Sequence, residues 1–98
     1  MSKGYIVAHV EVSDQAGYDE YRKGVGATVA AFGGRFLVRG GDPERLEGEG
    51  KTRRVVVLEF DSHARAKEWY HSKEYQQILP LRLRAGQADL FLVKGVDP

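Results

Sequence analysis

The side chains best suited to bind a ligand are one histidine, one tyrosine and two arginines: His9, Arg39, Tyr75 and Arg82. An arginine can hold a carboxylate through two parallel hydrogen bonds, and a tyrosine ring packs well against a planar apolar molecule. Imidazole titrates near neutral pH, so His9, which is predicted to lie on a strand, is the candidate general base. We therefore predict that these residues contact a small aromatic ligand that is anionic or carries a carbonyl group.

Each of these residues also has a structural interpretation, and the sequence leaves both open. Buried charges are tolerated when they are paired, so Arg39 can instead form an ion pair with Glu59 or Glu11. His9 can be a polar residue at an interface between subunits, and Tyr75 can belong to the hydrophobic core. A binding site requires a cavity beside these side chains that solvent can reach.

Several kinds of site are not indicated by the sequence. The chain has no cysteine, so it offers neither a thiolate nucleophile nor a zinc thiolate site. No histidine pair has metal-ligand spacing, and His63 and His71 are expected on a solvated helical surface. The sequence has no nucleotide-binding glycine motif, because Gly40-Gly41 is typical of a turn. It also has no nucleophilic serine motif. We expect neither a metal nor an organic cofactor, and no enzyme class follows.

Length and composition indicate one domain over residues 1–98, since 42% of the 98 residues are apolar and 30% are charged. The net charge of +1 lacks the basic excess expected of a protein that binds nucleic acid or an anionic membrane. The sequence also contains no signal-peptide pattern and no apolar run long enough to span a bilayer. We expect a cytoplasmic protein.

The most strand-like segment is 53–61, and both of its faces are largely apolar. Val56, Leu58 and Phe60 fall on one face, while Val55 and Val57 fall on the other. Such a strand belongs in the middle of a sheet that is covered on both sides. Alternating or apolar patterns predict further strands over residues 5–12, 35–39 and 88–96.

Apolar residues at helical spacing predict a long helix after Ser13 or Asp14, ended by Gly33-Gly34. A second helix is predicted after residues 61–62 as far as residue 70, and another segment from residue 73. Pro80 lies inside this last segment, so we expect a kink or a break near Leu79. The loop between the second and third strands is expected to be polar, with a possible short edge segment at residues 45–48.

The predicted order of strand, helix, strand, strand, helix, strand is that of an α+β, ferredoxin-like βαββαβ fold. Its four-stranded antiparallel sheet carries the helices on one face. The layer expected to face the helices is Ile6, Ala8, Val10, Phe36, Val38, Val56, Leu58, Phe60, Phe91 and Val93. The opposite layer is expected to contain Tyr5, Val7, His9, Leu37, Arg39, Val55, Val57, Glu59, Leu90, Leu92 and Lys94. The opposite layer is too apolar to face water, so we predict a homodimer that packs sheet on sheet.

Three parts of the sequence resemble a known family. They are Gly33-Gly34-Arg35-Phe36-Leu37-Val38-Arg39-Gly40-Gly41, the strand from Arg54 to Phe60, and the run Trp69-Tyr70, Ser72, Glu74-Tyr75 with Arg82. The chain resembles domain-of-unknown-function family 1330 (DUF1330), within the dimeric α+β barrel superfamily. The resemblance implies a ferredoxin-like homodimer whose distant relatives include cofactor-independent monooxygenases, muconolactone isomerases and haem-degrading enzymes. It implies no reaction, because a shared fold does not transfer chemistry.

Two hypotheses follow from the sequence. The first is a homodimer that binds or transforms a small aromatic or carboxylate-bearing molecule without a cofactor. The second is a non-catalytic binding or assembly module, in which polar residues between the subunits only fix the geometry of the dimer. A partly polar pocket open to solvent favours the first hypothesis, and a filled interior favours the second.

Overall fold

Four strands and three helices follow one another in the predicted order. The computed structural model describes residues 2–97. Its elements are β1 (Gly4–Val12), α1 (Gln15–Ala31), β2 (Arg35–Arg39), β3 (Arg54–Phe60), α2 (His63–His71), α3 (Lys73–Ala85) and β4 (Gly86–Lys94). The second helical region is divided at Ser72, as its sequence pattern predicts.

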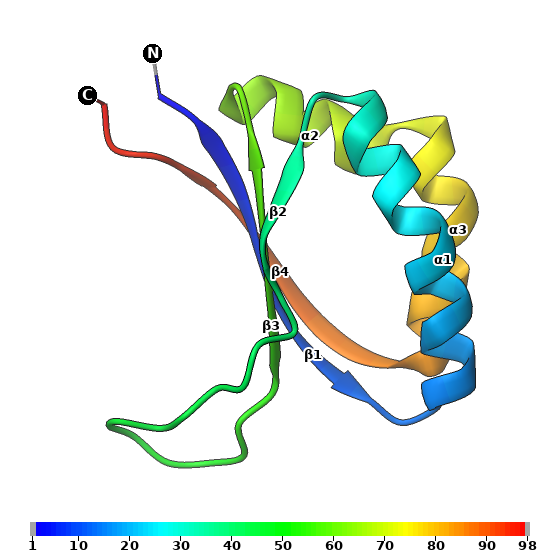
Figure 1. Cartoon of the computed structure of the whole chain (residues 1–98), viewed down its shortest axis with the longest axis vertical. Helices are drawn as coiled ribbons and strands as arrows, with labels where there is room; N and C mark the ends of the chain where they lie inside the picture. Colours follow the sequence, from blue (N-terminus) through cyan, green and yellow to red (C-terminus); the bar gives the residue numbers. More distant parts are fainter. Residues whose placement is uncertain (1, 98) are drawn as a thin grey trace.

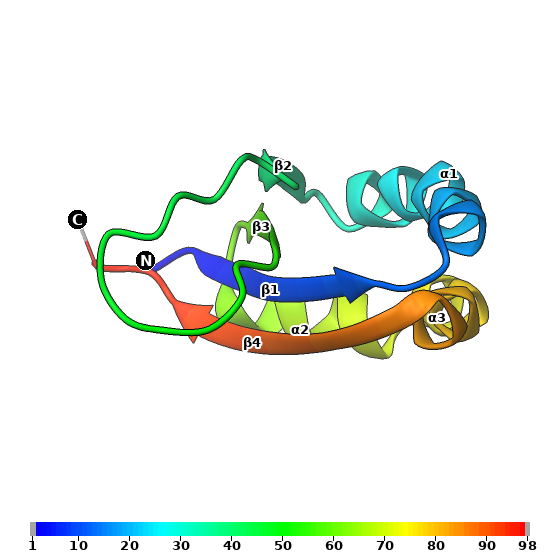
Figure 2. The ribbon, with the colours of Figure 1, turned by 90° about the horizontal axis from the view of Figure 1, so that it is seen from below.

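The strands form one antiparallel sheet in the order β2-β3-β1-β4. The three helices all lie on one face of this sheet, and the other face is open (Figure 1). Figure 2 shows the same arrangement from below, with α1 above α3 at one end of the molecule. This is the α+β, ferredoxin-like fold predicted from the sequence, which is confirmed.

Local hydrogen bonds explain where the helices begin and end. The Asp14 carboxylate accepts from the backbone N–H of Gly17 at 3.2 Å and caps α1. Ser62 and Ser72 cap α2 and α3 in the same way, each accepting from the backbone N–H three residues later at 3.0 and 3.1 Å. Gly33 has a φ of 74°, the left-handed conformation that terminates a helix at little cost in a glycine.

Helix α3 passes through Pro80 and continues to Ala85, so the break expected near Leu79 does not occur. Proline removes the hydrogen bond to the carbonyl of Gln76. Both Pro80 and Gln76 are exposed, so water can satisfy that carbonyl. The continuity places Arg82 on the same buried side of α3 as Tyr75.

The core lies between the helices and the sheet. Its largest fully buried side chains are Trp69, Tyr75, Phe60 and Val29. The indole N–H of Trp69 donates to Thr28 Oγ1 at 3.0 Å, which satisfies the one polar atom of the largest core residue. Helix α1 packs along α3 rather than closely against the sheet, so long side chains fill the space between α1 and the strands.

Strand β2 contains a bulge that reverses the predicted orientation of its second half. Phe36 pairs with Leu58, but Val38 pairs with Val57 and Arg39 with Val56, so Leu37 has no direct partner. Directly paired residues share a face of the sheet. Arg39 therefore faces the helices and Val38 the open side, and both predicted positions are wrong. A bulge inserts one unpaired residue, which simple alternation cannot anticipate.

The predicted orientation of β4 is also reversed. Leu90 pairs with Ala8 and Leu92 with Ile6, so both leucines face the helices. Phe91 and Val93 face the open side and are 56% and 41% exposed. Lys94, predicted on the open layer, pairs with Gly4 and so is in phase with the helix-facing residues. Both sets of alternate residues on this strand are apolar, so the pattern alone gives no phase.

The loop between β2 and β3 extends away from the sheet on the side opposite the helices (Figure 1). It contains neither helix nor strand, and the edge segment considered for residues 45–48 does not form. Leu46 in this loop is 88% exposed. Together with Phe91, Val93, Leu37 and Val38, it makes the open side of the molecule the more apolar exposed surface.

Candidate functional site

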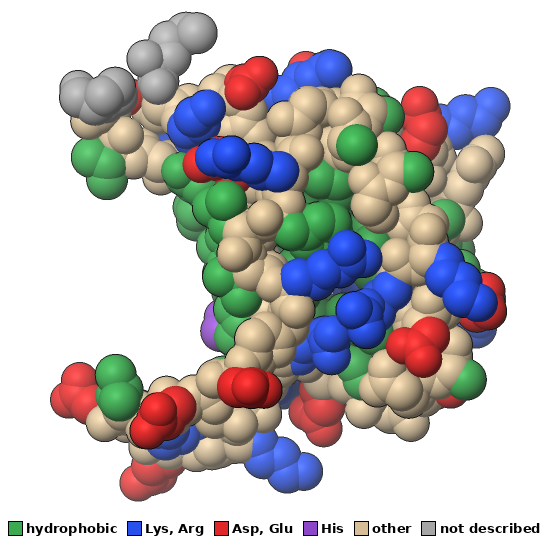
Figure 3. All heavy atoms as spheres, viewed as in Figure 1, with side chains coloured by type: hydrophobic (Ala, Val, Ile, Leu, Met, Phe, Trp, Pro, Cys, Tyr) green, Lys and Arg blue, Asp and Glu red, His purple; other side chains and the backbone are tan. Residues whose placement is uncertain are grey.

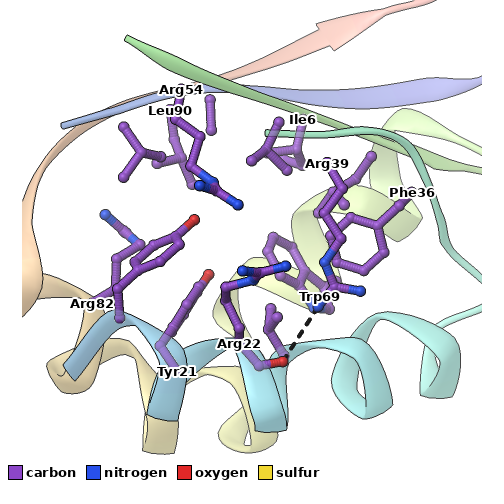
Figure 4. A pocket seen from close by; sticks show the side chains of 15 residues that line it. Ile6, Tyr21, Arg22, Phe36, Arg39, Arg54, Trp69, Arg82 and Leu90 are labelled. Atoms are coloured by element: carbon purple, nitrogen blue, oxygen red, sulfur yellow. Dashed lines mark hydrogen bonds between the residues drawn. The ribbon is translucent and has the colours of Figure 1, made fainter. Parts of the chain in front are cut away.

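One cavity between α1 and the sheet is lined by four arginines: Arg22, Arg39, Arg54 and Arg82. Its other walls come from Ile6, Ala8, Val10, Tyr18, Tyr21, Val25, Phe36, Val56, Leu58, Trp69 and Leu90. Figure 4 shows the guanidinium groups arriving from both sides, Arg54 and Arg39 from the sheet and Arg22 and Arg82 from the helices. None of the described residues that line the cavity is acidic.

Arg82 and two tyrosines form a buried hydrogen-bonded chain. Arg82 is only 6% exposed, and its Nε–H donates to the hydroxyl oxygen of Tyr75 at 3.3 Å. The Tyr75 and Tyr21 hydroxyl oxygens are 2.9 Å apart. Arg82 can only donate, so the Tyr75 oxygen accepts from it, and the Tyr75 O–H can donate to the Tyr21 oxygen. In that arrangement the Tyr21 O–H is free to donate into the cavity.

The Tyr21 hydroxyl remains protonated at physiological pH. Burial raises its pKa far above the ordinary value for tyrosine, and the neighbouring Tyr75 hydroxyl raises it further, while the positive charge of Arg82 acts in the opposite direction. Tyr21 is thus a hydrogen-bond donor beside a fixed cation. A hydroxyl and a guanidinium that both donate into one space favour an anionic oxygen there.

Arg54 enters the cavity from β3 and is held by its neighbours. Its guanidinium carbon lies 5.3 Å from the centre of the Tyr18 ring, within the range of a cation–π contact. Gly40 packs so closely against it that an added Cβ would lie 2.6 Å from Arg54 Nη2. Its Nε is buried and has no hydrogen-bond partner within residues 2–97. Such an unmatched buried donor is uncommon in native proteins and is an attractive partner for a ligand acceptor.

Arg22 and Arg39 lie together at the opposite end of the cavity from Arg82 (Figure 4). Arg39 Nη2 donates to the backbone carbonyl of Arg22 at 3.3 Å, and its guanidinium stacks on the Phe36 ring at 4.2 Å. Arg39 is exposed and Arg22 is half-buried, so this end opens to solvent. In the orientation of Figure 1, basic side chains gather where the sheet faces α1 (Figure 3).

None of the four cavity arginines forms an ion pair with a carboxylate in the part of the chain that the structure describes. Glu59, the partner considered for Arg39, is bound by Arg35 at 2.7 Å. Glu11, the other partner considered, lies 3.6 Å from Arg53. The structural interpretation of Arg39 as one half of an ion pair is therefore not realised.

The enclosed space is small, with a volume of about 40 Å³. That is room for one or two water molecules or the head of a carboxylate. A larger ligand requires the open end to widen. Arg39, which is exposed, and Arg22, which is half-buried, line this end, and their long flexible side chains can swing outward.

The structure brings together three of the four residues singled out in the sequence. Arg39 and Arg82 line the cavity, and Tyr75 supports Arg82 from behind. His9 is exposed on the open face of the sheet, where it borders a separate shallow pocket of about 360 Å³ with Arg53 and Asp89. The expected proximity of His9 and Arg39 is wrong, because the β2 bulge turns Arg39 to the other face.

Sequence reasoning missed Arg22, Arg54 and Tyr21 as site residues. Arg54 was detectable, since it alternates in phase with Val56 and Leu58 on the core-facing side of β3. A charged residue in such a row indicates either a buried ion pair or a binding site. Arg22 follows a core tyrosine in α1, and nothing in its sequence context distinguishes it from a solvated helical arginine.

Within residues 2–97, no group of three or more histidine, cysteine, aspartate or glutamate side chains is arranged to hold a metal ion. None of the helices found in this range is long and apolar enough to cross a membrane.

A family model described as "Domain of unknown function (DUF1330)" matches residues 3–96. No curated protein matches the sequence. The chain is similar in structure to RPA0582, a protein of unknown function from Rhodopseudomonas palustris. The TM-score is 0.78 at 18% identity, over 99% of this chain and 85% of that one.

Two further solved structures share the fold at lower similarity. SnoaB, a cofactor-independent oxygenase from Streptomyces nogalater, has a TM-score of 0.63 at 11% identity, over 100% of this chain and 97% of its own. A dimeric ferredoxin-like protein of unknown function from Jannaschia sp. CCS1 has a TM-score of 0.63 at 10% identity, over 93% and 97%. At these identities the comparisons establish the fold alone.

Proposed function

The chain belongs to the DUF1330 family, whose description names no reaction, and we propose from the cavity itself that the protein binds a small carboxylate-bearing molecule between its helices and its sheet. The observation that carries the proposal is the set of four arginines that line one cavity and have no acidic partner among residues 2–97. The net charge of the chain is only +1, so this cluster does not reflect a generally basic protein.

Unpaired cations in a confined space repel one another and lose part of their hydration. Effective interaction energies between charges a few ångströms apart near a protein surface are several kcal/mol, about 4 kcal/mol at 4 Å. Proteins usually relieve this cost with a carboxylate of their own, as Glu59 does for Arg35. A ligand anion relieves it in the cavity, because guanidinium groups match carboxylate geometry.

The donors that would receive the carboxylate are those at the enclosed end. Arg82 and Tyr21 are both buried there, and Arg54 Nε offers a donor that has no protein partner within the described chain. The aromatic faces of Trp69 and Phe36 and the aliphatic side chains around them then supply an apolar wall for the organic part of the ligand. Apolar walls with a few convergent polar groups are the usual composition of small-molecule sites.

The residues of the cavity support binding better than proton-transfer catalysis. Among the described residues, no histidine, aspartate or glutamate lines the cavity, so none of these lining groups accepts a proton near neutral pH. The fold is shared with a cofactor-independent oxygenase, but that activity belongs to the relative and rests on its own site.

We further propose that the protein works as a homodimer joined through the open sheet face. Phe91, Val93 and Leu37 are exposed there by 56%, 41% and 46%. An apolar face of this kind is unfavourable in water. A relative of the same fold is described as dimeric, which supports the same arrangement here. The cavity lies on the helix side, so this interface leaves it accessible.

Isothermal titration calorimetry with benzoate and benzamide tests the binding proposal. The two probes share an aromatic ring and differ in charge, so benzoate is expected to bind and benzamide is not. Arg54→Gln should weaken benzoate binding about tenfold or more, because a charge-assisted hydrogen bond is lost. Arg35→Gln is the matched control, since Arg35 lies outside the cavity and is paired with Glu59. Equal binding of both probes, or equal loss in both variants, would contradict the proposal.

A further inference from the structure

We infer that the ligand of this cavity carries two anionic groups, one at each end of an apolar body, as in an aromatic dicarboxylate. The inference rests on the proposed function and specifies its ligand. It comes from the distribution of the arginines, which fall into two groups rather than one ring (Figure 4).

The inner group is built around Arg82. This arginine is 6% exposed and is fixed by the hydroxyl of Tyr75, while Tyr21 lies beside it with a hydroxyl that can donate. Both positions are set by the packing of α1 against α3. The inner end is therefore a rigid set of donors, which binds one carboxylate at little cost in conformational entropy.

The outer group is built around Arg39 and Arg22, which contact one another through a hydrogen bond to the Arg22 carbonyl. Arg39 reaches this place only because the β2 bulge turns it towards the helices. Its guanidinium rests on Phe36, which leaves the edge of the fork available to a second anion.

Arg54 stands between the two groups on the sheet side of the cavity (Figure 4). Val56, Leu58 and Trp69 are among the apolar residues that line the cavity. A ligand with one charged head would leave the far group of arginines unmatched. Two anionic ends on a flat apolar body match both groups and the apolar lining.

The count of charges points in the same direction. Four guanidinium groups face the cavity, and none has a carboxylate partner in residues 2–97. A monoanion neutralises only one of the four. A dianion leaves less uncompensated charge in a confined site, where water screens charges less than it does at an open surface.

The space enclosed in this structure, about 40 Å³, accommodates only the inner carboxylate. Arg39 and Arg22 would first swing outward, so that the ligand body can enter the outer end. They would then bind the second carboxylate. Arg39 is exposed and Arg22 is half-buried, so their side chains can move without a change in the backbone.

Calorimetric titration with benzoate, terephthalate and phenyl phosphate tests the inference. Terephthalate has two separated anionic ends, whereas phenyl phosphate has a single doubly charged head. Terephthalate is expected to bind at least tenfold more tightly than benzoate. The difference corresponds to about one additional charge-assisted hydrogen bond, made by the second carboxylate. Phenyl phosphate is expected to bind less tightly than terephthalate.

Two variants assign the ends. Arg39→Gln should remove the advantage of terephthalate over benzoate, and Arg82→Gln should weaken the binding of both. Arg35→Gln is the control outside the cavity, and circular dichroism confirms that each variant is folded. If Arg82→Gln unfolds, Tyr21→Phe takes its place, because it removes the other donor of the inner group.

The outcomes separate the inference from the proposed function. If no acid binds, both fail. If benzoate and terephthalate bind equally, or each substitution weakens both by the same factor, the cavity holds one anion and the inference fails while the proposed function stands. If phenyl phosphate binds best and Arg39→Gln leaves its affinity unchanged, the ligand has a single dianionic head, which also overturns the inference.

Discussion

The arginines on the two sides of the sheet differ in whether they have carboxylate partners. On the open face, Arg35 binds Glu59 at 2.7 Å, and Arg53 contacts Asp89 at 3.2 Å. On the helix side, Arg54 of β3 and Arg82 of α3 enter a cavity where no carboxylate from residues 2–97 pairs with them. The arginines of the open face are thus paired with carboxylates, whereas those on the more enclosed helix side are not.

The difference separates arginines that hold the fold together from arginines kept available for something else. A buried cation without a counter-ion destabilises the protein that contains it. Strain or unpaired charge retained in an enclosed place is a mark of function rather than of architecture. By this criterion we propose the helix side as the place where a ligand binds. The open face, whose charges are already paired, is the one we propose as the contact with another subunit.

The largest expected effect tests the open face. Val57→Glu places a second carboxylate near Glu59 on that face, where Val57 pairs with Val7 and Val38. Like charges at an interface cost several kcal/mol, so the dimer dissociation constant should rise by about a hundredfold or more. Sedimentation velocity measures it, with Val57→Ile as the control for shape. A variant dimer as tight as the wild type would show that this face is not the interface.

The next effect tests the supports of the cavity. Tyr75→Phe removes the hydroxyl that joins Arg82 to Tyr21 and leaves both without that partner. Losing the partner of buried polar groups costs about 1–3 kcal/mol, which lowers Tm by several degrees in a domain of this size.

Tyr70→Phe is the matched control for this prediction. Tyr70 stands next to the same cluster, but its hydroxyl makes no hydrogen bond to any residue from 2 to 97. Thermal denaturation followed by circular dichroism should show a clear fall for Tyr75→Phe and almost none for Tyr70→Phe. Equal falls would mean that the hydroxyl chain contributes nothing specific.

A smaller effect is expected at Gly40. Its φ is 82°, and an added Cβ would meet Arg54 Nη2 at 2.6 Å, so Gly40→Ala strains the backbone and displaces the guanidinium. The conformational cost alone is about 1–2 kcal/mol. Gly41→Ala is the control, because its Cβ would meet only Val38 at an ordinary 3.6 Å. If only Gly40→Ala lowers both Tm and benzoate affinity, the glycine positions Arg54. If Gly40→Ala lowers Tm but leaves the benzoate affinity unchanged, Gly40 is needed only for the backbone of the turn.

The comparison of the two faces is tested most directly by removing one arginine from each. Arg35→Gln leaves Glu59 without its cation and should lower Tm slightly. Arg39→Gln removes one of four mutually repelling charges and should leave Tm unchanged or raise it at low salt. The difference should shrink in 1 M sodium chloride, which screens exposed charges. Equal losses of Tm in the two variants would remove the distinction on which the binding proposal depends.

The smallest effect concerns pH. Partial burial acts to raise the pKa of Glu59, but hydrogen bonds from Arg35 and Tyr5 outweigh it and hold the pKa below its ordinary value. A carboxyl group with a lowered pKa in the folded state stabilises the protein above its unfolded pKa. That contribution is lost as pH falls through the folded value. Below about pH 4.5, the Tm of the wild type should therefore fall more steeply than that of Glu59→Gln, whereas parallel curves would show that the pair is not stabilising.

The parts of the structure that sequence predicted well are those fixed by neighbouring residues. Asp14, Ser62 and Ser72 each cap the helix that follows them, and Gly33 ends α1. Capping requires only a side chain and a backbone N–H a few residues apart, so a local pattern is enough. The order of the elements and the ferredoxin-like topology follow from the same signals.

The parts that sequence predicted poorly depend on how one strand meets another. The phase of β4 is set by the pairing of Leu90 with Ala8, and its own residues are apolar in both phases. The face of Arg39 is set by the unpaired Leu37. The cavity needs Arg39, Arg54 and Arg82 to converge from β2, β3 and α3, which no local pattern specifies.

The bulge in β2 also bears on how this site could have arisen. One unpaired residue, Leu37, decides whether Arg39 lies in the cavity or on the opposite face. A change of a single codon in length, rather than any exchange of one amino acid for another, is therefore enough to create or abolish the outer end of the site. Comparing relatives column by column without gaps would align arginines that lie on opposite sides of the sheet. The history of this site is best followed through insertions and deletions in the second strand.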